Sequence, residues 1–343
     1  MKALVLQEYH QLVYEDVPEP EIATDGVLIQ VKACGICGSD VHGLDGSTGR
    51  RIPPIIMGHE ASGMIIQAGK DVKDFTAGDR VTFDSTIYCG ACYFCRRGQI
   101  NLCDNRRVLG VSCQDYRQHG AFAEYVAVPQ RILYRLPETL SYERAAMVEP
   151  VSIAFHAMTL TPITLNNTAV VVGAGMIGIL LIQALRLAGC GQIIAVDLAP
   201  QKLALASQAG ADVVLQAGQN NVTAEILKLT DERGADLAFE VVGNTTALNT
   251  AIASLRKGGT LTIIGNLAPT VEFPLQAIVT RQITVYGSCS SSGEYSACLD
   301  MIAAGKINVD LLINKVAPLS EGAFWFQKLY NGEDNLMKVI LQP

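Results

Sequence analysis

The clearest hydrophobic pattern in the chain starts at Thr168, and it predicts a strand, a helix and a second strand. Small and β-branched residues at 169–172 are typical of a buried parallel strand. Strong helix formers follow at 179–187. A second apolar run at 192–196 then ends in Asp197. This order indicates one strand–helix–strand unit of a parallel sheet.

The same alternation continues through the second half of the chain. Further strands are predicted at 212–215, 237–241, 260–264 and 283–286, with the clearest helices at 223–230 and 246–255. Together with the first unit, they make six strands, which predicts an α/β Rossmann fold with a doubly wound parallel sheet. The connection at 268–280 shows no clear period, so we expect it to be partly irregular.

The first half of the chain is β-rich instead, and no helical period is visible before Tyr142. Its short apolar runs, separated by turn signals, lie at 2–6, 27–34, 63–68, 80–83 and 122–128. They predict a mostly β, barrel-like domain, to which the last apolar run at 339–341 is expected to return. The predicted organisation is a β domain at 1–150, a dinucleotide-binding domain at 151–287 and a return segment at 288–343.

Composition narrows the class of protein. The 343 residues suit two domains, and 49% apolar with 17% charged residues is typical of a well-buried enzyme. A net charge of −7 without a long basic run disfavours nucleic-acid binding. Gln183 and Arg186 interrupt the longest apolar stretch, so no membrane span is expected, and the run at 3–6 is too short for a signal peptide. We therefore expect a cytoplasmic protein whose ten cysteines are metal ligands or buried thiols.

Three glycines between the first strand and its helix form a dinucleotide-binding fingerprint. Gly173, Gly175 and Gly178 have the spacing G-x-G-x-x-G, and Met176 and Ile177 stand between the last two. The first glycine permits a tight turn, the second lets the backbone approach a pyrophosphate, and the third lets the helix pack closely on the strand. A glycine-rich turn of another α/β protein is the alternative, but the complete unit favours a dinucleotide at the positive helix N-terminus.

Asp197 indicates which dinucleotide is bound. An acidic side chain at the end of the second strand accepts hydrogen bonds from the ribose hydroxyls and would repel a 2′-phosphate. We therefore predict NAD+/NADH rather than NADP. Loops after later strands also face the cofactor in such sheets, which makes Val242, Gly265 and Ser288 candidate contacts. For the loop at Ser288, simple flexible linkage is the alternative.

Four cysteines near the middle of the β-rich half have metal-ligand spacing. Cys89, Cys92, Cys95 and Cys103 read C-x-x-C-x-x-C-x7-C within a lobe at about 88–104. Four thiolates close the tetrahedral shell of a zinc ion and leave no position for a substrate, so the predicted role is structural. An iron–sulfur cluster, which also uses four thiolates, is the competing interpretation.

A second candidate metal site combines Cys37 with the His59-Glu60 pair. Taken alone these residues are weak evidence, because His59 can equally be a hydrogen-bonded core histidine. Cys34 and Cys37 also have the C-x-x-C spacing of a redox pair. That motif normally opens a helix, whereas here it follows a predicted strand and is rich in glycine, so we favour a metal ligand.

The whole chain resembles the zinc-containing medium-chain alcohol and polyol dehydrogenases, in the sorbitol dehydrogenase-like branch. The resemblance rests on motifs that occur in the family's order, including the four-cysteine lobe and the dinucleotide fingerprint. The others are Gly58-His59-Glu60-x-x-Gly63-x5-Gly69 and Gly78-Asp79-Arg80-Val81. It implies a GroES-like catalytic domain joined to the Rossmann domain, two zinc ions per chain, NAD and a homodimer or homotetramer.

The resemblance also implies a ligand set for the catalytic zinc. Cys37 and His59 match the two invariant ligands. Glu149-Pro150-Val151-Ser152 is similar to the Glu-Pro-Leu-Ser pattern of polyol dehydrogenases, in which Glu60 is a ligand and Glu149 contacts the metal directly or through water. Cys37 and Glu60 already neutralise Zn²⁺, so we expect Glu149 to act through water, with a role in supporting the ligands as the alternative.

The activity implied is oxidation of a secondary alcohol with transfer of a hydride to the nicotinamide, and proton loss through Ser39 and His42. A surface histidine is the alternative for His42. Lys202 stands where the family places a basic residue over the adenosine ribose, although a solvated helix lysine fits equally well.

The substrate class stays open between a polyol, a sugar alcohol phosphate and, as the second choice, threonine. Gly43 and Leu44 follow His42, where sorbitol-type relatives usually carry an aromatic residue, so sorbitol itself is not favoured. Arg50 and Arg51 are expected as a solvated pair, with contact to a sugar phosphate as the alternative. A non-enzymatic zinc-lobe binding module is the least favoured interpretation, since the net charge is negative.

Overall fold

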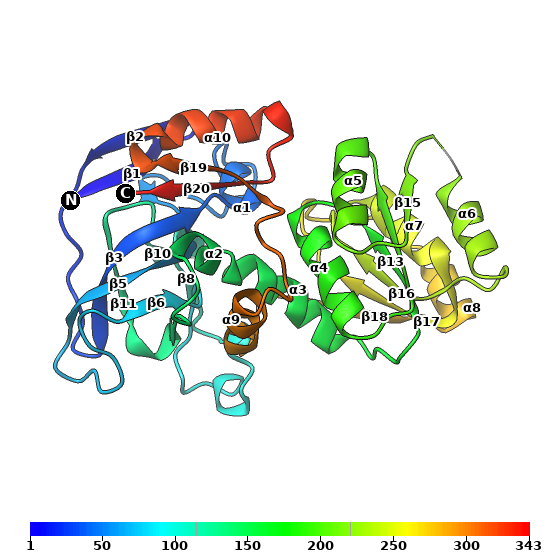
Figure 1. Cartoon of the computed structure of the whole chain (residues 1–343), viewed down its shortest axis with the longest axis horizontal. Coiled ribbons are helices and arrows are strands. Elements are labelled where there is room, and N and C mark those ends of the chain that lie inside the picture. Colours follow the sequence, from blue (N-terminus) through cyan, green and yellow to red (C-terminus); the bar gives the residue numbers. More distant parts are fainter. Residues whose placement is uncertain (114–115, 220) are drawn as a thin grey trace. The chain divides into compact units, whose positions relative to one another are not determined.

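The computed structural model describes residues 1–113, 116–219 and 221–343. The chain divides into two compact units, which are labelled element by element in Figure 1. The first unit comprises residues 1–149 and 292–343, and the second comprises residues 150–291. The boundary between them falls inside helix α3 (Val148–Leu160).

The first unit is built around a seven-stranded, largely antiparallel sheet of order β12-β6-β5-β3-β20-β19, with β11 paired to β3. These strands are β3 (Gly26–Gly35), β5 (Glu60–Ala68), β6 (Arg80–Phe83), β11 (Tyr125–Pro129), β12 (Leu133–Arg135), β19 (Ile313–Pro318) and β20 (Lys338–Gln342). Strand β20, from the C-terminal end, pairs with β3 from the N-terminal part. Two segments far apart in sequence therefore share one sheet.

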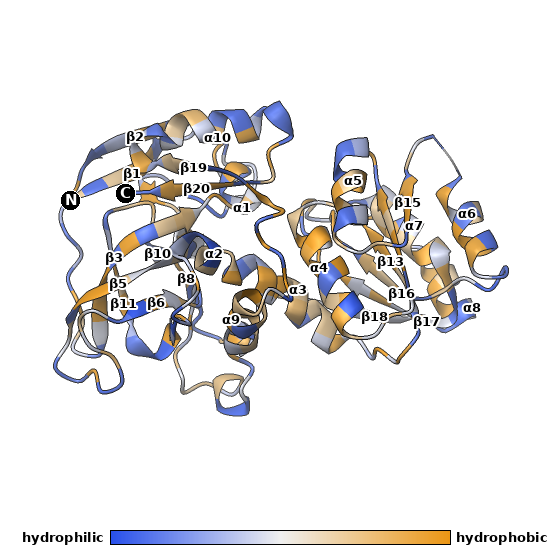
Figure 2. Cartoon of the chain, viewed as in Figure 1, coloured by the Kyte–Doolittle hydropathy of each residue, from blue (hydrophilic) through white to orange (hydrophobic). Residues whose placement is uncertain are grey.

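Smaller elements surround this sheet. The short strands are β1 (Lys2–Glu8), β2 (Gln11–Asp16), β4 (Ile55–Ile56), β7 (Thr86–Ile87), β8 (Arg107–Val108), β9 (Val111–Cys113) and β10 (Tyr116–Gln118). The helices are α1 (Gly38–Val41), α2 (Tyr142–Ala146), α9 (Tyr295–Ala303) and α10 (Gly322–Tyr330). The core between them contains Phe122 and Phe326, whose rings meet edge to face with centroids 5.5 Å apart. In Figure 2 hydrophobic and hydrophilic residues are mixed along strands of this unit such as β3, and β19 is mostly exposed, as in an antiparallel sheet with one solvated face.

The second unit is a six-stranded parallel sheet of order β15-β14-β13-β16-β17-β18. Its strands are β13 (Thr168–Val172), β14 (Gln192–Asp197), β15 (Val213–Gln216), β16 (Ala235–Glu240), β17 (Leu255–Ile263) and β18 (Thr284–Gly287). The helices are α4 (Met176–Leu187), α5 (Pro200–Gln208), α6 (Val222–Leu229), α7 (Thr245–Ser254) and α8 (Leu275–Arg281). This strand order is that of a doubly wound dinucleotide-binding sheet, and the predicted fold class is confirmed.

Some boundaries differ from the prediction for physical reasons. The apolar run at 122–128 enters strand β11 only at Tyr125, because Phe122 and Ala123 are buried against β1 through a single bridge instead of a ladder. The connection at 268–280 is partly irregular as expected, since 268–274 form neither helix nor strand before helix α8, whose C-cap Gln282 is left-handed. Within the described part of the chain, no helix is long and apolar enough to cross a membrane.

Candidate metal centres and cofactor site

Cys37, His59 and Glu60 lie together in the first unit. One potential ligand atom from each is within 4.8 Å of the others. Cys37 follows strand β3, while His59 immediately precedes β5 and Glu60 is the first residue of β5. Gly58 makes this approach possible, because it has φ +95° and any Cβ would lie 2.9 Å from both the Cys34 sulfur and the Phe122 backbone nitrogen. The structure thus brings three of the sequence-predicted ligands to one point.

His59 is held from both sides of its ring. Its Nδ1 lies 3.4 Å from Asp40 Oδ1, and its Nε2 lies 3.5 Å from the Ser39 hydroxyl. Burial alone would lower the pKa of His59, but the charges of Asp40 and Cys37 raise the pKa well above its usual range. The surroundings of the imidazole therefore favour a positive charge at this point, which a bound cation supplies as well as a proton does.

Glu60 forms a buried ion pair with Lys338 on strand β20. Both side chains are 0% exposed, and Lys338 Nζ donates hydrogen bonds to Glu60 Oε2 and, at 2.9 Å, to the Ile36 carbonyl. The second carboxylate oxygen, Oε1, is buried without a hydrogen-bond partner among the residues described. One oxygen of Glu60 is thus held by a protein cation and the other is left for a metal, so this donor set fits zinc.

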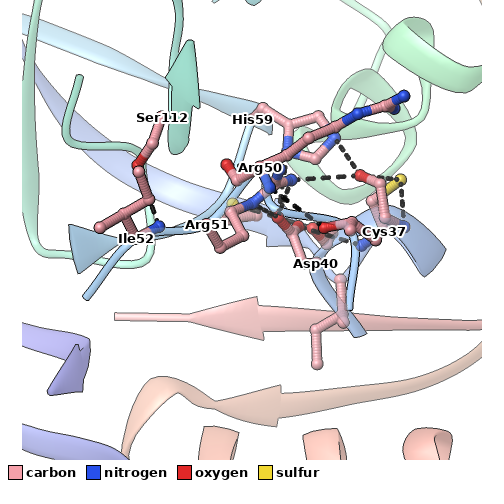
Figure 3. A network of polar contacts seen from close by, with 12 residues as sticks. Cys37, Asp40, Arg50, Arg51, Ile52, His59 and Ser112 are labelled. Atoms are coloured by element: carbon pink, nitrogen blue, oxygen red, sulfur yellow. Dashed lines mark hydrogen bonds and ion pairs between the residues drawn. The ribbon is translucent and has the colours of Figure 1, made fainter. Parts of the chain in front are cut away.

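Arg51 departs most clearly from the prediction (Figure 3). It was expected in a solvated pair, but its side chain is only 2% exposed, whereas Arg50 is exposed. Arg51 Nη2 donates to Asp40 Oδ1 at 2.7 Å and to the Ser39 hydroxyl oxygen at 3.2 Å. Although burial alone would raise it, the charges of His59 and Arg51 hold the pKa of Asp40 well below its usual range. The prediction for Arg51 is therefore wrong, because a tertiary partner pulls the side chain inward.

The structure also corrects the argument against a redox cysteine pair. Cys37 does open a helix, since it caps the N-terminus of α1 and its sulfur accepts hydrogen bonds from the Ser39 amide at 3.4 Å and hydroxyl at 3.3 Å. What opposes a redox pair is Cys34, which is buried and whose thiol pKa is raised by that burial. A reactive thiol needs the opposite environment.

Glu149 and His42 do not join the three-residue cluster. Glu149 is half-buried in the first turn of α3. Desolvation raises its pKa to about 7; the charge of His59 opposes this shift and that of Glu60 adds to it. His42 is exposed at the end of α1, and its carbonyl accepts a hydrogen bond from the Ser47 hydroxyl. The His119 ring serves the backbone instead, accepting from the Ile56 amide through Nδ1 at 3.2 Å.

The four cysteines of the lobe converge on a second point. All four sulfurs lie within 4.8 Å of one another, and those of Cys89 and Cys95 are 4.0 Å apart. Sulfurs about 2.3 Å from one zinc ion would stand roughly 3.8 Å apart at the corners of a tetrahedron. The backbone amides of Ala91 and Cys92 donate to the Cys89 sulfur and lower its pKa to about 6. This spacing fits one ion better than a multi-iron cluster, in which the four thiolates are divided among two or four irons.

The glycine fingerprint has the geometry that each position was expected to need. Gly173 adopts φ +104°, and a Cβ on Gly178 would lie 1.9 Å from the Gly173 carbonyl oxygen. Gly175 caps helix α4, which begins at Met176 and Ile177, and a Cβ there would meet no atom within 4 Å. Asp197 accepts hydrogen bonds from the Ala174 amide at 2.7 Å and the Ala199 amide at 2.9 Å. The acidic side chain is therefore fixed beside the fingerprint.

Other cofactor candidates lie at the carboxyl ends of the parallel strands. The Val242 and Gly243 amides donate to the buried Glu240 carboxylate at 2.8 and 2.7 Å, a contact that the sequence pattern did not predict. A Cβ on Gly265 would lie 2.1 Å from the Gly243 nitrogen, so these two loops touch. The Ser288 hydroxyl is buried without a partner in the described part of the chain, and Lys202 is half-buried on α5.

Comparisons with known proteins identify the family of the chain. Residues 23–138 match the family model "Alcohol dehydrogenase GroES-like domain" and residues 177–304 match "Zinc-binding dehydrogenase". The chain is 34% identical to sorbitol dehydrogenase of Bacillus subtilis, over 100% of this chain and 97% of that protein. It is also 34% identical to D-arabitol-phosphate dehydrogenase of Enterococcus avium, over 97% and 94%. Among solved structures, a zinc-binding dehydrogenase of Sinorhizobium meliloti bound to NADP is similar, with a TM-score of 0.91, 31% identity and coverage of 100% and 99%.

Proposed function

The chain belongs to the zinc-binding alcohol dehydrogenase family, and we propose that it oxidises a secondary alcohol of a polyol to the ketone, reversibly, with zinc and NAD+. The observation that carries this proposal is the meeting of Cys37, His59 and Glu60 in a chain that also holds a complete dinucleotide fingerprint. The names of several relatives support the polyol class, among them sorbitol dehydrogenase and D-xylulose reductase.

Cys37, His59 and Glu60 would hold the catalytic zinc, and Cys89, Cys92, Cys95 and Cys103 the structural one. Bound zinc would lower the pKa of an alcohol, and NAD+ would accept the hydride. Asp40 faces His59 Nδ1 and so keeps Nε2 directed toward the metal side. Zinc analysis should return two ions per chain, and one in a Cys37→Ala variant.

Ser39 is the residue best placed to take up the alcohol's proton. Its hydroxyl lies 3.3 Å from Cys37 Sγ and 3.5 Å from His59 Nε2, beside two of the ligands. We propose the exposed His42, at the end of the same short helix, as the next proton acceptor, and Glu149 as a contact to the metal through water. A Ser39→Ala variant should bind NADH as the native protein does while turning over alcohol far more slowly.

NAD rather than NADP is the proposed cofactor, since Asp197 ends β14 and its carboxylate is fixed beside Ala174. Lys202, Val242, Gly265 and Ser288 are proposed as further contacts to it. The Sinorhizobium meliloti relative is bound to NADP, so the comparison of both dinucleotides in the same assay is the direct test. A higher kcat/KM with NADP+ would refute the assignment.

The substrate test is an NAD-coupled screen of polyols, sugar alcohol phosphates and threonine. Relatives include enzymes named for free polyols and for phosphorylated ones. Arg51 is occupied by Asp40 and Ser39, so only Arg50 of this pair is exposed to a phosphate. If phosphorylated substrates are preferred, Arg50→Ala should raise their KM alone. Preference for threonine would contradict the polyol assignment.

A homodimer or homotetramer is proposed from the edge strand β18. Thr284 and Val285 are exposed on this strand, and edge strands need to be covered. Pairing with a second copy would cover it. Light scattering coupled to size-exclusion chromatography measures the state directly, and a monomer at micromolar concentration would refute it.

A further inference from the structure

Arg51 connects two parts of the proposed catalytic centre through a single nitrogen atom. Its Nη2 lies 2.7 Å from Asp40 Oδ1 and 3.2 Å from the Ser39 hydroxyl oxygen, while Nε adds a third contact to Asp40 at 3.3 Å. Asp40 in turn faces His59, and Ser39 faces Cys37. Because the Ser39 hydroxyl also lies 3.5 Å from His59 Nε2, Arg51, Asp40, His59 and Ser39 form a closed ring of contacts, to which Cys37 is attached through Ser39 (Figure 3).

The packing around Arg51 holds its side chain in this buried position. A Cβ on Gly43 would lie 2.3 Å from Arg51 Cγ, so the space for the arginine stem depends on a glycine. Asp40 is 0% exposed and Arg51 is 2% exposed, which means that the pair is shielded from water. Burying two charges has a desolvation cost, and an exposed arginine would avoid it.

Resting on the proposed function, we propose that Arg51 is a positioning residue that orients the Ser39 hydroxyl and fixes it to the Asp40–His59 pair. A guanidinium only donates hydrogen bonds, and a serine hydroxyl has one proton and two lone pairs. Because Arg51 occupies a lone pair of Ser39, the serine proton must point away from Arg51. The hydroxyl donates this proton to Cys37 Sγ, and its second lone pair is left to accept the proton of the alcohol.

A lysine at position 51 would not fix the contact to Ser39. The guanidinium holds Asp40 with two nitrogens of its rigid fork, Nε and Nη2, and this sets the direction in which Nη2 meets Ser39. An ammonium is a point charge on a flexible stem, so a lysine would keep the ion pair with Asp40 without a fixed contact to Ser39. Arg51→Lys therefore removes the fixed contact to Ser39 while it keeps the positive charge beside Asp40. Arg50→Lys, at the neighbouring exposed residue, is the matched control.

The first measurement is steady-state oxidation by fully zinc-loaded protein, with zinc content and thermal midpoint recorded for each variant. Loss of such a supporting contact typically costs about 10–100-fold in activity. For Arg51→Lys we expect a fall in kcat of this size with KM changed less than about threefold, since the hydroxyl acts only in the reaction step. Gly43→Ala, which displaces the Arg51 stem without removing its charge, should give the same pattern.

A double-mutant cycle then tests whether Arg51 acts through Ser39. In a Ser39→Ala background, Arg51→Lys should lower kcat less than about threefold, because the acceptor is already absent. An equal loss in both backgrounds would overturn the proposal, since it would indicate a purely structural arginine. So would Arg51→Lys protein with native kcat.

A readout without substrate keeps this inference separate from the proposed function. Cobalt(II) exchanged into the Cys37 site gives a thiolate-to-metal charge-transfer band, isolated as the difference from a Cys37→Ser variant. Ser39 donates to Cys37 Sγ, so Arg51→Lys should shift this band and Arg50→Lys should not. If no alcohol is oxidised, the proposed function fails, and an unchanged cobalt band would independently overturn the role of Arg51.

Discussion

Replacing Lys338 by methionine should destabilise the first unit, and more so without the catalytic zinc than with it. Lys338 and Glu60 are both 0% exposed, so no water can compensate the carboxylate once the ammonium is removed. Lys338 Nζ also donates to the Ile36 carbonyl, which would lose its partner. Zinc at the Cys37–His59–Glu60 site would return a positive charge to Glu60, and so reduce the penalty.

The size of the effect follows from the burial of the pair. Removing one partner of a buried ion pair costs about 3–5 kcal/mol. The first unit has roughly 200 residues, and a domain of this size loses about 2–4 °C of thermal midpoint per kcal/mol. The zinc-depleted variant should therefore melt about 6–20 °C below the zinc-depleted native protein. The difference between the two thermal midpoints should be smaller when zinc is bound at the Cys37–His59–Glu60 site.

Differential scanning fluorimetry of both proteins, each with two zinc ions or with the four-cysteine ion alone, measures these four midpoints. Lys338→Arg should behave nearly as the native protein because it keeps the cation, and Lys306→Met, at an exposed position, controls for loss of a lysine. An equal drop in midpoint with and without catalytic zinc would refute the reasoning, because Glu60 would then not be shared between Lys338 and the metal.

Three further predictions concern other parts of the chain. Burial raises the pKa of Asp84 to about 6 from 3.8. The folded protein therefore favours the protonated carboxyl, and this contribution to the free energy of unfolding is lost as the pH rises through 6. By denaturant titration, Asp84→Asn should be more stable than the native protein at pH 7 by up to about 2–3 kcal/mol and equal to it near pH 4. Gly178→Ala should abolish NADH binding, measured by fluorescence transfer, because its Cβ would stand 1.9 Å from the Gly173 carbonyl oxygen; retained native affinity would contradict this. Asp197→Ser should raise kcat/KM for NADP+ relative to NAD+ by at least tenfold in steady-state assays, and an unchanged ratio would show that Asp197 does not select the cofactor.

The parts of the molecule that were predictable from sequence are those in which local pattern and tertiary role agree. Strand β13, the three glycines and helix α4 follow one another directly, and the close approach at Gly178 is to Gly173, five positions earlier. The four-cysteine lobe is local in the same sense. The spacing of residues in the sequence predicts such features, because short loops form them without contacts to distant segments.

The contacts around the catalytic metal site were not predictable in this way. Glu60 and Lys338 are 278 residues apart, and only the pairing of β20 with β3 brings them together. Arg51 has a short sequence distance to Asp40, yet nothing in its neighbourhood distinguishes it from the exposed Arg50. Basic residues are solvated by default, and the exceptions depend on a partner that the fold supplies.

Lys338 also changes the charge of the metal centre. Counting Cys37 and Glu60 alone, a bound Zn²⁺ would be neutral, and ionised Glu149 would make the site anionic. Lys338 adds one buried positive charge, whereas Asp40 and Arg51 cancel each other. The centre then keeps one unit of positive charge, which either Glu149 or an ionised alcohol can neutralise. Glu149 and an ionised alcohol together would carry two negative charges, one more than the centre neutralises, and like charges in a buried site repel. In the proposed centre, Glu149 and the substrate would therefore compete for one positive charge, which would give Glu149 a physical reason to leave the metal when the alcohol binds.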